Sequence, residues 1–159
     1  MTDADWGTWT PSERAALCFV VSGGRILLIH KKRGLGAGKV NGPGGRREPG
    51  ESAEDCARRE TLEEVGVEPR GLVRAGELRF QFLDGYALLI DVFTASEAVG
   101  EPRETDEADP FWADVSAIPY ADMWPDDAIW LPEMLAGRPF RGRFRFDGDR
   151  LLSHSMEPA

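Results

Sequence analysis

The sequence predicts an α/β fold, an α/β/α sandwich around a mixed β-sheet. Two observations predict it: apolar, strand-like runs stand both before and after the clearest helical segment, residues 53–65, and a second helix interrupts the strands near residue 130. With 159 residues the chain is long enough to bury a hydrophobic core, and 42% hydrophobic and 30% charged residues are ordinary for a globular protein. We therefore expect one domain, residues 13–159, preceded by an extension, residues 1–12.

The first strands are predicted by two apolar runs, residues 15–21 and 25–29, with a hairpin turn at residues 22–24. The stretch that follows, residues 30–45, is too rich in glycine for a helix or a regular strand. It is either a flexible loop or a backbone that passes close to a ligand, and we favour the second because it leads directly into the acidic helix. Its cations are then available for phosphate groups: Lys31, Lys32, Arg33 and Lys39.

Strands and one helix fill the rest of the chain. Leu78, Phe80 and Phe82 alternate with polar residues, which predicts one apolar strand face, and the nearly continuous apolar run 86–94 predicts a central strand. A helix is expected to begin near Asp126 and to end before Gly137. The remaining expectations are an acidic, turn-like segment at 97–109 and strands at 111–118, 140–146 and 149–154.

Composition and charge narrow the class of function. The formal net charge of −9 argues against a nucleic-acid polymer as partner, but it permits a nucleotide substrate because a bound cation offsets the charge of the site. No apolar run approaches the roughly 20 residues that span a bilayer, so no membrane association is expected. The acidic N-terminus lacks the pattern of a secretory signal, and Cys18 and Cys56 have no disulfide or metal-site spacing. We expect a cytoplasmic protein with free thiols, a monomer, with a dimer as the alternative.

The helix at 53–65 carries three carboxylates on one face. Glu60, Glu63 and Glu64 stand at positions i, i+3 and i+4. Like charges at these spacings repel, and a hard divalent cation would remove the repulsion by taking the oxygens as ligands. Mg²⁺ also accepts phosphate oxygens of a substrate, which indicates phosphate chemistry. Arg59 is placed to brace one of the carboxylates. The alternative for the whole face is an acidic, solvated helix surface.

The spacing around this helix is specific. Gly45, Glu51 and the segment RETLEEVGV at 59–67 fit the pattern Gly-x5-Glu-x7-Arg-Glu-U-x-Glu-Glu-x-Gly-U, with U a bulky aliphatic residue. Seven fixed residues, at about one in fifteen each, coincide by chance on the order of once in 10⁸ windows. The chain thus resembles the Nudix hydrolases, which implies the Nudix fold and a divalent cofactor, Mg²⁺, with Mn²⁺ as a substitute. Thr61 departs from the pattern at the first U position, a mild change because its methyl group can still face the core.

Beyond this motif, residues 17–152 resemble the eukaryotic-type branch of the Nudix hydrolases that degrades oxidised purine nucleoside triphosphates, the 8-oxo-dGTP diphosphatases. The most specific segments are KKRGLGAGKVNGPGG at 31–45, LRFQF at 78–82, TDEADPFW at 105–112 and DMWPDDAIW at 122–130. The resemblance implies catalytic roles for Arg59 and for the metal-binding or water-activating carboxylates Glu60, Glu63, Glu64 and Glu107, helped by the carbonyl of Gly44 or Gly45. It implies substrate-binding roles for Lys31, Asn41, Gly44, Gly45, Phe80, Phe82, Trp124, Asp126 and Asp127.

The chemistry of Asp126 and Asp127 suits recognition of a base. Two adjacent acids in an apolar, aromatic-lined pocket can share one proton, so that one donates a hydrogen bond while the other accepts one. Such a pair can bind the lactam-like edge of a purine. The alternative for these two residues is a simple helix N-cap, and the alternative for Phe80 and Phe82 is ordinary core packing.

We expect a Mg²⁺-dependent pyrophosphohydrolase that converts an oxidised purine nucleoside triphosphate, such as 8-oxo-dGTP, into the nucleoside monophosphate and pyrophosphate, as in sanitation of the nucleotide pool. Leu35 and Val40 stand where the branch usually carries aromatic residues, which leaves the preferred purine open. One alternative is a Nudix enzyme for other nucleotides, such as ADP-ribose, dinucleoside polyphosphates or unmodified dNTPs. Another is a non-catalytic nucleotide-sensing module, against which the complete set of motif glutamates argues.

Overall fold

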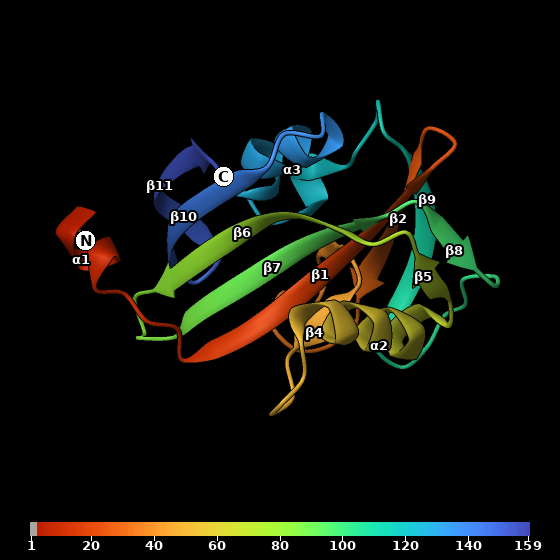
Figure 1. Cartoon of the computed structure of the whole chain (residues 1–159), viewed down its shortest axis with the longest axis horizontal. Helices are drawn as coiled ribbons and strands as arrows, with labels where there is room; N and C mark the ends of the chain where they lie inside the picture. Colours follow the sequence, from red (N-terminus) through yellow and green to blue (C-terminus); the bar gives the residue numbers. More distant parts are fainter. Residues whose placement is uncertain (1–2) are drawn as a thin grey trace.

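A mixed β-sheet forms the centre of the molecule, with one helix against each of its faces (Figure 1). The computed structural model describes residues 3–159. Helix α2 (Ala53–Val65) covers one face of the sheet and helix α3 (Asp127–Leu135) covers the other. The predicted α/β/α sandwich with a mixed sheet is confirmed.

Within the described residues, nine strands form the main sheet: β1 (Glu13–Ser22), β2 (Arg25–Lys31), β3 (Val40–Asn41), β4 (Gly44–Arg46), β6 (Val73–Phe82), β7 (Ala87–Ala95), β9 (Ala108–Asp114), β10 (Phe140–Asp147) and β11 (Arg150–Pro158). Their order is β11-β10-β6-β7-β1-β2-β3, with β4 paired to β1 and β9 to β2. The pairs β1–β7 and β6–β10 are parallel, whereas their neighbours pair antiparallel. Two shorter strands, β5 (Glu68–Arg70) and β8 (Glu97–Val99), form a separate antiparallel pair.

Hydrophobic cores lie on both faces of this sheet. On the side of α3 the core is rich in large aromatic side chains, among them the fully buried Phe144 and Trp130. On the side of α2 the buried side chains are smaller and include Cys18, Ala57 and Val65. Helix α2 packs mainly against β1 and β4. Its glutamates are thereby brought next to β4.

Most predicted elements are confirmed. Strands β1 and β2 form the predicted hairpin, β6 has the alternating buried face, β7 lies between β6 and β1, and α3 has the predicted extent. Four predictions were wrong in part. The segment 97–109, predicted to be turn-like, contains β8 and the first residues of β9, which covers residues 108–114 instead of 111–118. Strand β11 runs to residue 158, and the glycine-rich stretch contains β3 and β4. These two short strands have no local signal because they exist only through pairing with β2 and β1.

The segment before the sheet packs where β6 meets β7. A short helix, α1 (Asp3–Gly7), lies at one end of the molecule (Figure 1). Trp6 is buried, the indole nitrogen of Trp9 donates a hydrogen bond to Gln81 Oε1 (2.9 Å), and the N–H of Ser12 donates to the carbonyl of Ala87 (2.8 Å). The division into an extension, 1–12, and a domain, 13–159, stays a prediction, and residues 1 and 2 of that extension lie outside the described residues.

Both cysteines are buried and unpaired, which confirms the predicted free thiols. Burial raises the pKa of the Cys18 thiol to about 11 and that of Cys56 to about 12, so neither is a reactive thiolate at neutral pH. Between residues 3 and 159, no helix is long and apolar enough to cross a membrane.

Candidate active site

The acidic helix α2 begins and ends where its sequence indicates. The hydroxyl of Ser52 accepts a hydrogen bond from the N–H of Asp55 (3.0 Å), which satisfies a donor of the first helical turn. Gly66 ends the helix with a φ of +75°, a left-handed conformation that glycine adopts without strain. Thr61 and Val65 are buried against the sheet. The neighbouring face of the helix therefore turns its glutamates toward β4 and the loop before β9.

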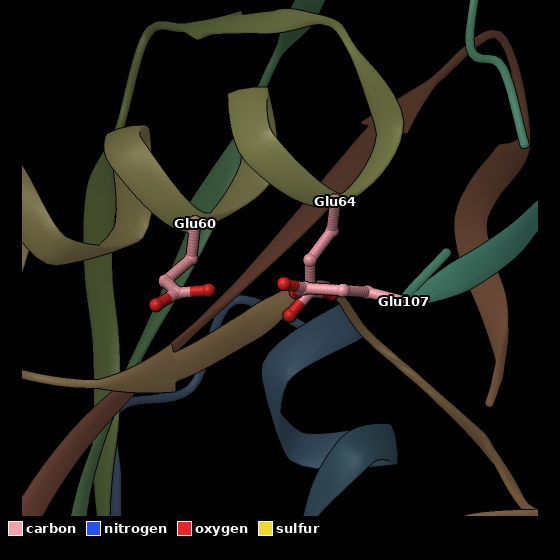
Figure 2. Close-up of side chains that lie close together, drawn as sticks. All are labelled: Glu60, Glu64 and Glu107. Atoms are coloured by element: carbon pink, nitrogen blue, oxygen red, sulfur yellow. The ribbon is translucent and has the colours of Figure 1, made fainter. Parts of the chain in front are cut away.

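Three carboxylates gather below α2. Glu60 and Glu64 project from the helix, and Glu107 approaches them from the loop that precedes β9 (Figure 2). One oxygen of each carboxylate lies within 4.8 Å of the chosen oxygens of the other two. Glu63 stands apart from this cluster, because its side chain is 53% exposed and its Oε2 lies 3.3 Å from Nη1 of Arg59. Its role as a metal ligand stays a prediction.

Arg59 forms hydrogen bonds with the carboxylates of Glu51 and Glu60. Its guanidinium binds Glu51 with two hydrogen bonds (Nε–Oε2 2.7 Å, Nη2–Oε1 2.9 Å) and donates a third to Glu60 Oε1 (2.8 Å). The hydrogen bond from Arg59 lowers the pKa of Glu51 to about 2, because the guanidinium stabilises the ionised form. This is the geometry that a bracing role for Arg59 requires.

The electrostatics of the cluster favour a cation. Burial, followed by the nearby charge of Glu60, raises the pKa of Glu64 to about 8, while the charge of Lys31 opposes this rise. Burial also raises the pKa of Glu60, although Arg59 acts in the opposite direction. Among the described residues, Glu64 Oε2 is buried without a hydrogen-bond partner. Ionisation of this buried carboxyl is costly unless a positive charge compensates it.

The donor set fits a hard divalent ion such as Mg²⁺. Ligand oxygens stand about 2.0–2.1 Å from Mg²⁺, so two ligands on opposite sides of one ion are about 4 Å apart. The observed spread of 4.8 Å then needs only a small closing movement of the side chains. A side chain at Gly45 would obstruct the site, since a Cβ there would lie 2.5 Å from Glu60 Cδ. The residues that would hold the ion are Glu60, Glu64 and Glu107.

A cavity of about 460 Å³ connects the carboxylates with the beginning of α3. Most of the predicted substrate-binding residues line it: Lys31, Asn41, Gly44, Gly45, Phe80, Trp124, Asp126 and Asp127. Phe82 is not part of this lining, because its ring packs behind the cavity wall, with its centre 6.1 Å from that of Trp124 and 5.4 Å from that of Phe146. Its contact with a substrate stays a prediction.

Asp126 and Asp127 are buried carboxylates at the start of α3. Asp126 occupies the N-cap position but makes no capping hydrogen bond, and its Oδ2 accepts one from Nε1 of Trp130 (2.7 Å). The simple N-cap interpretation is therefore wrong. Burial raises the pKa of Asp126 to about 6, and burial with the adjacent charge of Asp126 raises the pKa of Asp127 well above its ordinary value. In the described part of the chain, Asp126 Oδ1 and Asp127 Oδ2 have no hydrogen-bond partner. The pair can therefore hold one shared proton near neutral pH.

The family model for the NUDIX domain matches residues 11–134, most of the chain. This chain belongs to the Nudix hydrolase family. The Nudix hydrolase is 43% identical over 148 residues to the oxidized purine nucleoside triphosphate hydrolase of Danio rerio, a match that covers 92% of this chain and 95% of that protein. The protein of the same name from Mus musculus is 42% identical over 142 residues, with 88% and 91% covered.

Solved structures agree with this assignment. A MutT protein from Bacillus halodurans superimposes on the Nudix hydrolase with a TM-score of 0.81 at 27% identity, covering 92% of this chain and 99% of that protein. A MutT NUDIX hydrolase from Burkholderia pseudomallei is 29% identical with a TM-score of 0.64, covering 70% and 88%. The predicted family and fold are both confirmed.

Some residues of the cavity were not predicted. In this Nudix hydrolase, Tyr86 lines the cavity, its hydroxyl donates a hydrogen bond to Glu13 Oε2 (2.8 Å), and Glu13 also pairs with Arg46 (3.2 Å). The sequence carries no signal for this contact, since a tyrosine beside an apolar run is common. Of the two departures from the branch, Leu35 lines the cavity whereas Val40 is buried in the core.

Proposed function

We propose that this Nudix hydrolase converts oxidised purine nucleoside triphosphates, such as 8-oxo-dGTP, into the nucleoside monophosphate and pyrophosphate, and so removes damaged nucleotides from the pool. The observation that carries the proposal is the pair Asp126 and Asp127. It stands in the same cavity as the cluster of Glu60, Glu64 and Glu107, and both aspartates have a free buried oxygen among the described residues. The names and high identity of the zebrafish and mouse relatives support the same substrate class.

The base would bind at the α3 end of the cavity. An oxo group on a purine converts part of its edge into a lactam, which presents an N–H donor beside a carbonyl acceptor. With one shared proton, Asp126 and Asp127 offer one acceptor and one donor, and the proton can reside on either residue. Asn41 adds a donor, because its Oδ1 already accepts a hydrogen bond from the N–H of Gly42 (2.8 Å) and its amide NH₂ stays available. Trp124 supplies an aromatic surface beside these groups.

The triphosphate would extend toward the carboxylates. Mg²⁺, or Mn²⁺ in its place, supplies charge neutralisation on the phosphate oxygens and a more acidic water. Glu60, Glu64 and Glu107 would hold the ion, and Lys31 offers further positive charge at this end. In the reaction, a water oxygen forms a bond to phosphorus while the bond from that phosphorus to the departing phosphate oxygen breaks. One carboxylate of the cluster takes the proton from the water.

We further propose that the enzyme acts in the cytoplasm as a monomer on free nucleotides, and not on nucleic-acid polymers or membranes. The formal net charge of −9 supports this, because a nucleic-acid-binding surface needs an excess of positive charge. The two unpaired, buried thiols are compatible with a reducing compartment.

A substrate panel tests the proposal. Purified protein with Mg²⁺ is assayed on 8-oxo-dGTP, 2-oxo-dATP, dGTP, dATP and ADP-ribose, the products are separated by chromatography, and the substrates are ranked by kcat/KM. We expect an oxidised purine triphosphate to rank first and pyrophosphate to be released. Glu64→Gln serves as the inactive control, since it keeps the shape of the side chain but removes the charge. A flat ranking, or ADP-ribose in first place, would contradict the proposed substrate while leaving Nudix hydrolysis in place.

A further inference from the structure

The loop that carries Glu107 has no secondary structure of its own. Residues 100–107 form neither helix nor strand between β8 and β9. Glu107 must nevertheless keep its carboxylate within 4.8 Å of oxygens that belong to Glu60 and Glu64 on α2. Some contact has to fix the loop relative to the helix.

The hydroxyl of Thr105 makes such a contact close to Glu107, in addition to the hydrogen bond from the N–H of Arg103 to the carbonyl of Val65. Its Oγ1 donates a hydrogen bond to the carbonyl oxygen of Glu64 (2.7 Å) and accepts one from the backbone N–H of Glu107 (3.2 Å). One hydroxyl group therefore joins the main chains of two residues whose side chains lie in the carboxylate cluster. The N–H of Lys32 donates to the carbonyl of Glu107 (3.0 Å) and so holds the loop from its other side.

The end of α2 explains why a hydroxyl is useful here. The last four carbonyls of a helix have no partner inside the helix and need donors from elsewhere. The carbonyl of Leu62 accepts from the N–H of Gly66 and that of Val65 accepts from the N–H of Arg103 (2.9 Å), but the loop offers no backbone N–H to Glu64. Thr105 supplies the missing donor, so the contact that completes the helix end also sets the position of the loop.

We propose that Thr105 is a positioning residue that holds Glu107 at the distance from Glu64 at which both carboxylates bind one divalent ion. The inference rests on the proposed metal-dependent function. Thr105 does not touch the ion or the substrate in this account, and it acts through Glu107. Partners of this kind, which orient a metal ligand, typically change metal affinity by about 10–100-fold when they are removed.

The test is a titration of the nucleotide-free protein with Mn²⁺, in which free Mn²⁺ is followed by electron paramagnetic resonance. Thr105→Val keeps the shape of the side chain but removes the hydroxyl, and we expect its Kd for Mn²⁺ to rise about 10-fold. Thr105→Ser restores the hydroxyl and should stay within about twofold of the wild type. Thr61→Val is the matched control, because the hydroxyl of Thr61 donates to the carbonyl of Ala57 (2.7 Å) in the same helix without contacting the loop.

A double variant separates positioning from a general effect on the fold. If Thr105 acts through Glu107, then Thr105→Val combined with Glu107→Gln should bind Mn²⁺ no more weakly than Glu107→Gln alone. Additive losses, a Kd of Thr105→Val equal to that of the wild type, or a Thr105→Ser variant as weak as Thr105→Val would each overturn the inference. The Tm of every variant is measured without metal, and if Thr105→Val does not fold, Thr105→Ala is compared with Thr105→Ser in its place.

The same titration gives a different result if the proposed metal site itself is wrong. In that case the wild type would not bind Mn²⁺, or Glu107→Gln would bind it as tightly as the wild type. A wild type that binds and a Glu107→Gln variant that binds weakly would leave the site in place, so that the result for Thr105 stands by itself.

Discussion

Replacing Arg59 with Met tests how far the charges around α2 stabilise the fold. Met keeps a long apolar stem but removes the guanidinium. The shortest hydrogen bonds lost are two with Glu51 (2.7 and 2.9 Å) and one with Glu60 (2.8 Å), and longer ones to the carbonyl of Arg46 (3.1 Å) and to Glu63 Oε2 (3.3 Å) are lost with them. The side chains of Arg59 and Glu51 are only 23% and 12% exposed, so water compensates poorly for the loss.

The size of the expected loss of stability follows from the carboxylates that stay behind without their cation. A hydrogen bond to a charged group contributes about 1.5–3 kcal/mol, and breaking a buried pair on one side costs about 3–5 kcal/mol because a charge stays unpaired. Since both carboxylates keep some contact with water, we expect the free energy of unfolding to fall by about 2–4 kcal/mol at pH 7. In a domain of this size, this corresponds to a fall in Tm of roughly 4–16 °C.

The difference in the free energy of unfolding between the wild type and Arg59→Met should also depend on pH. The pKa of Glu51 is lowered to about 2 in the folded protein from its ordinary value of 4.5. The ionised carboxylate therefore stabilises the fold fully above pH 4.5, and this contribution is lost as the pH falls from about 4.5 toward about 2. Urea unfolding of the wild type and Arg59→Met between pH 7 and pH 3 measures the difference, which should shrink over the acid part of the range.

Arg138→Met is the matched control for this experiment. Arg138 makes the same two-pronged contact with Glu133 (2.6 and 3.3 Å), but its side chain is 64% exposed. An exposed pair of this kind contributes little to stability, because water screens its charges. Equal losses in the two variants, or a deficit of Arg59→Met that stays constant down to pH 3, would refute the reasoning.

Three further predictions concern the cavity. Asp127→Asn should lower kcat/KM for 8-oxo-dGTP and should flatten the dependence of the free energy of unfolding on pH between pH 5 and 8. The reason is that the raised pKa values of the two aspartates make the wild type lose stability as the pH rises through them. Urea unfolding across that range measures the effect, and parallel profiles for the two proteins would contradict it. Gly45→Ala places a Cβ 2.5 Å from Glu60 Cδ and should weaken Mn²⁺ binding about 10-fold with little change in Tm, whereas unchanged affinity would exclude Glu60 as a ligand. Leu35→Phe adds aromatic surface at the cavity and should lower KM for 8-oxo-dGTP by about twofold to tenfold, while Val40→Phe, at a buried core position, should instead lower the free energy of unfolding by about 1–3 kcal/mol.

The helix α2 could be predicted residue by residue because its information is local. The cap at Ser52, the buried ridge with Thr61 and Val65 and the end at Gly66 all depend on neighbours within the same helix. The predicted grouping of Glu60, Glu63 and Glu64 at one ion stays a prediction, since Glu63 contacts Arg59 and not the other carboxylates. Successive residues of a helix are roughly 100° apart, so Glu63 and Glu64 diverge around the axis, and only Glu64 turns with Glu60 toward Glu107.

Other features depend on contacts that no local pattern records. Glu107 could be placed only through the family resemblance, because it stands in a loop far along the chain from α2. The role of Thr105 was not predicted at all, since its hydroxyl meets Glu64 only where the loop passes the end of the helix. Asp126 and Asp127 gave a chemical signal as adjacent acids, but their burial follows from the packing of α3 on the sheet.

The parallel pairing of β10 with β6 has a consequence for how the protein is made. The rings of Phe144 and Phe146 on β10 lie 5.7 and 5.1 Å from the ring of Phe80, behind the base end of the cavity. A parallel neighbour that is distant in the sequence can pair only after the chain between the two strands has been synthesised. On the ribosome, α2 with its glutamates therefore emerges well before the strand that supports the aromatic wall. The aromatic wall behind this end of the cavity is therefore completed only when β10 pairs with β6, late in the synthesis of the chain.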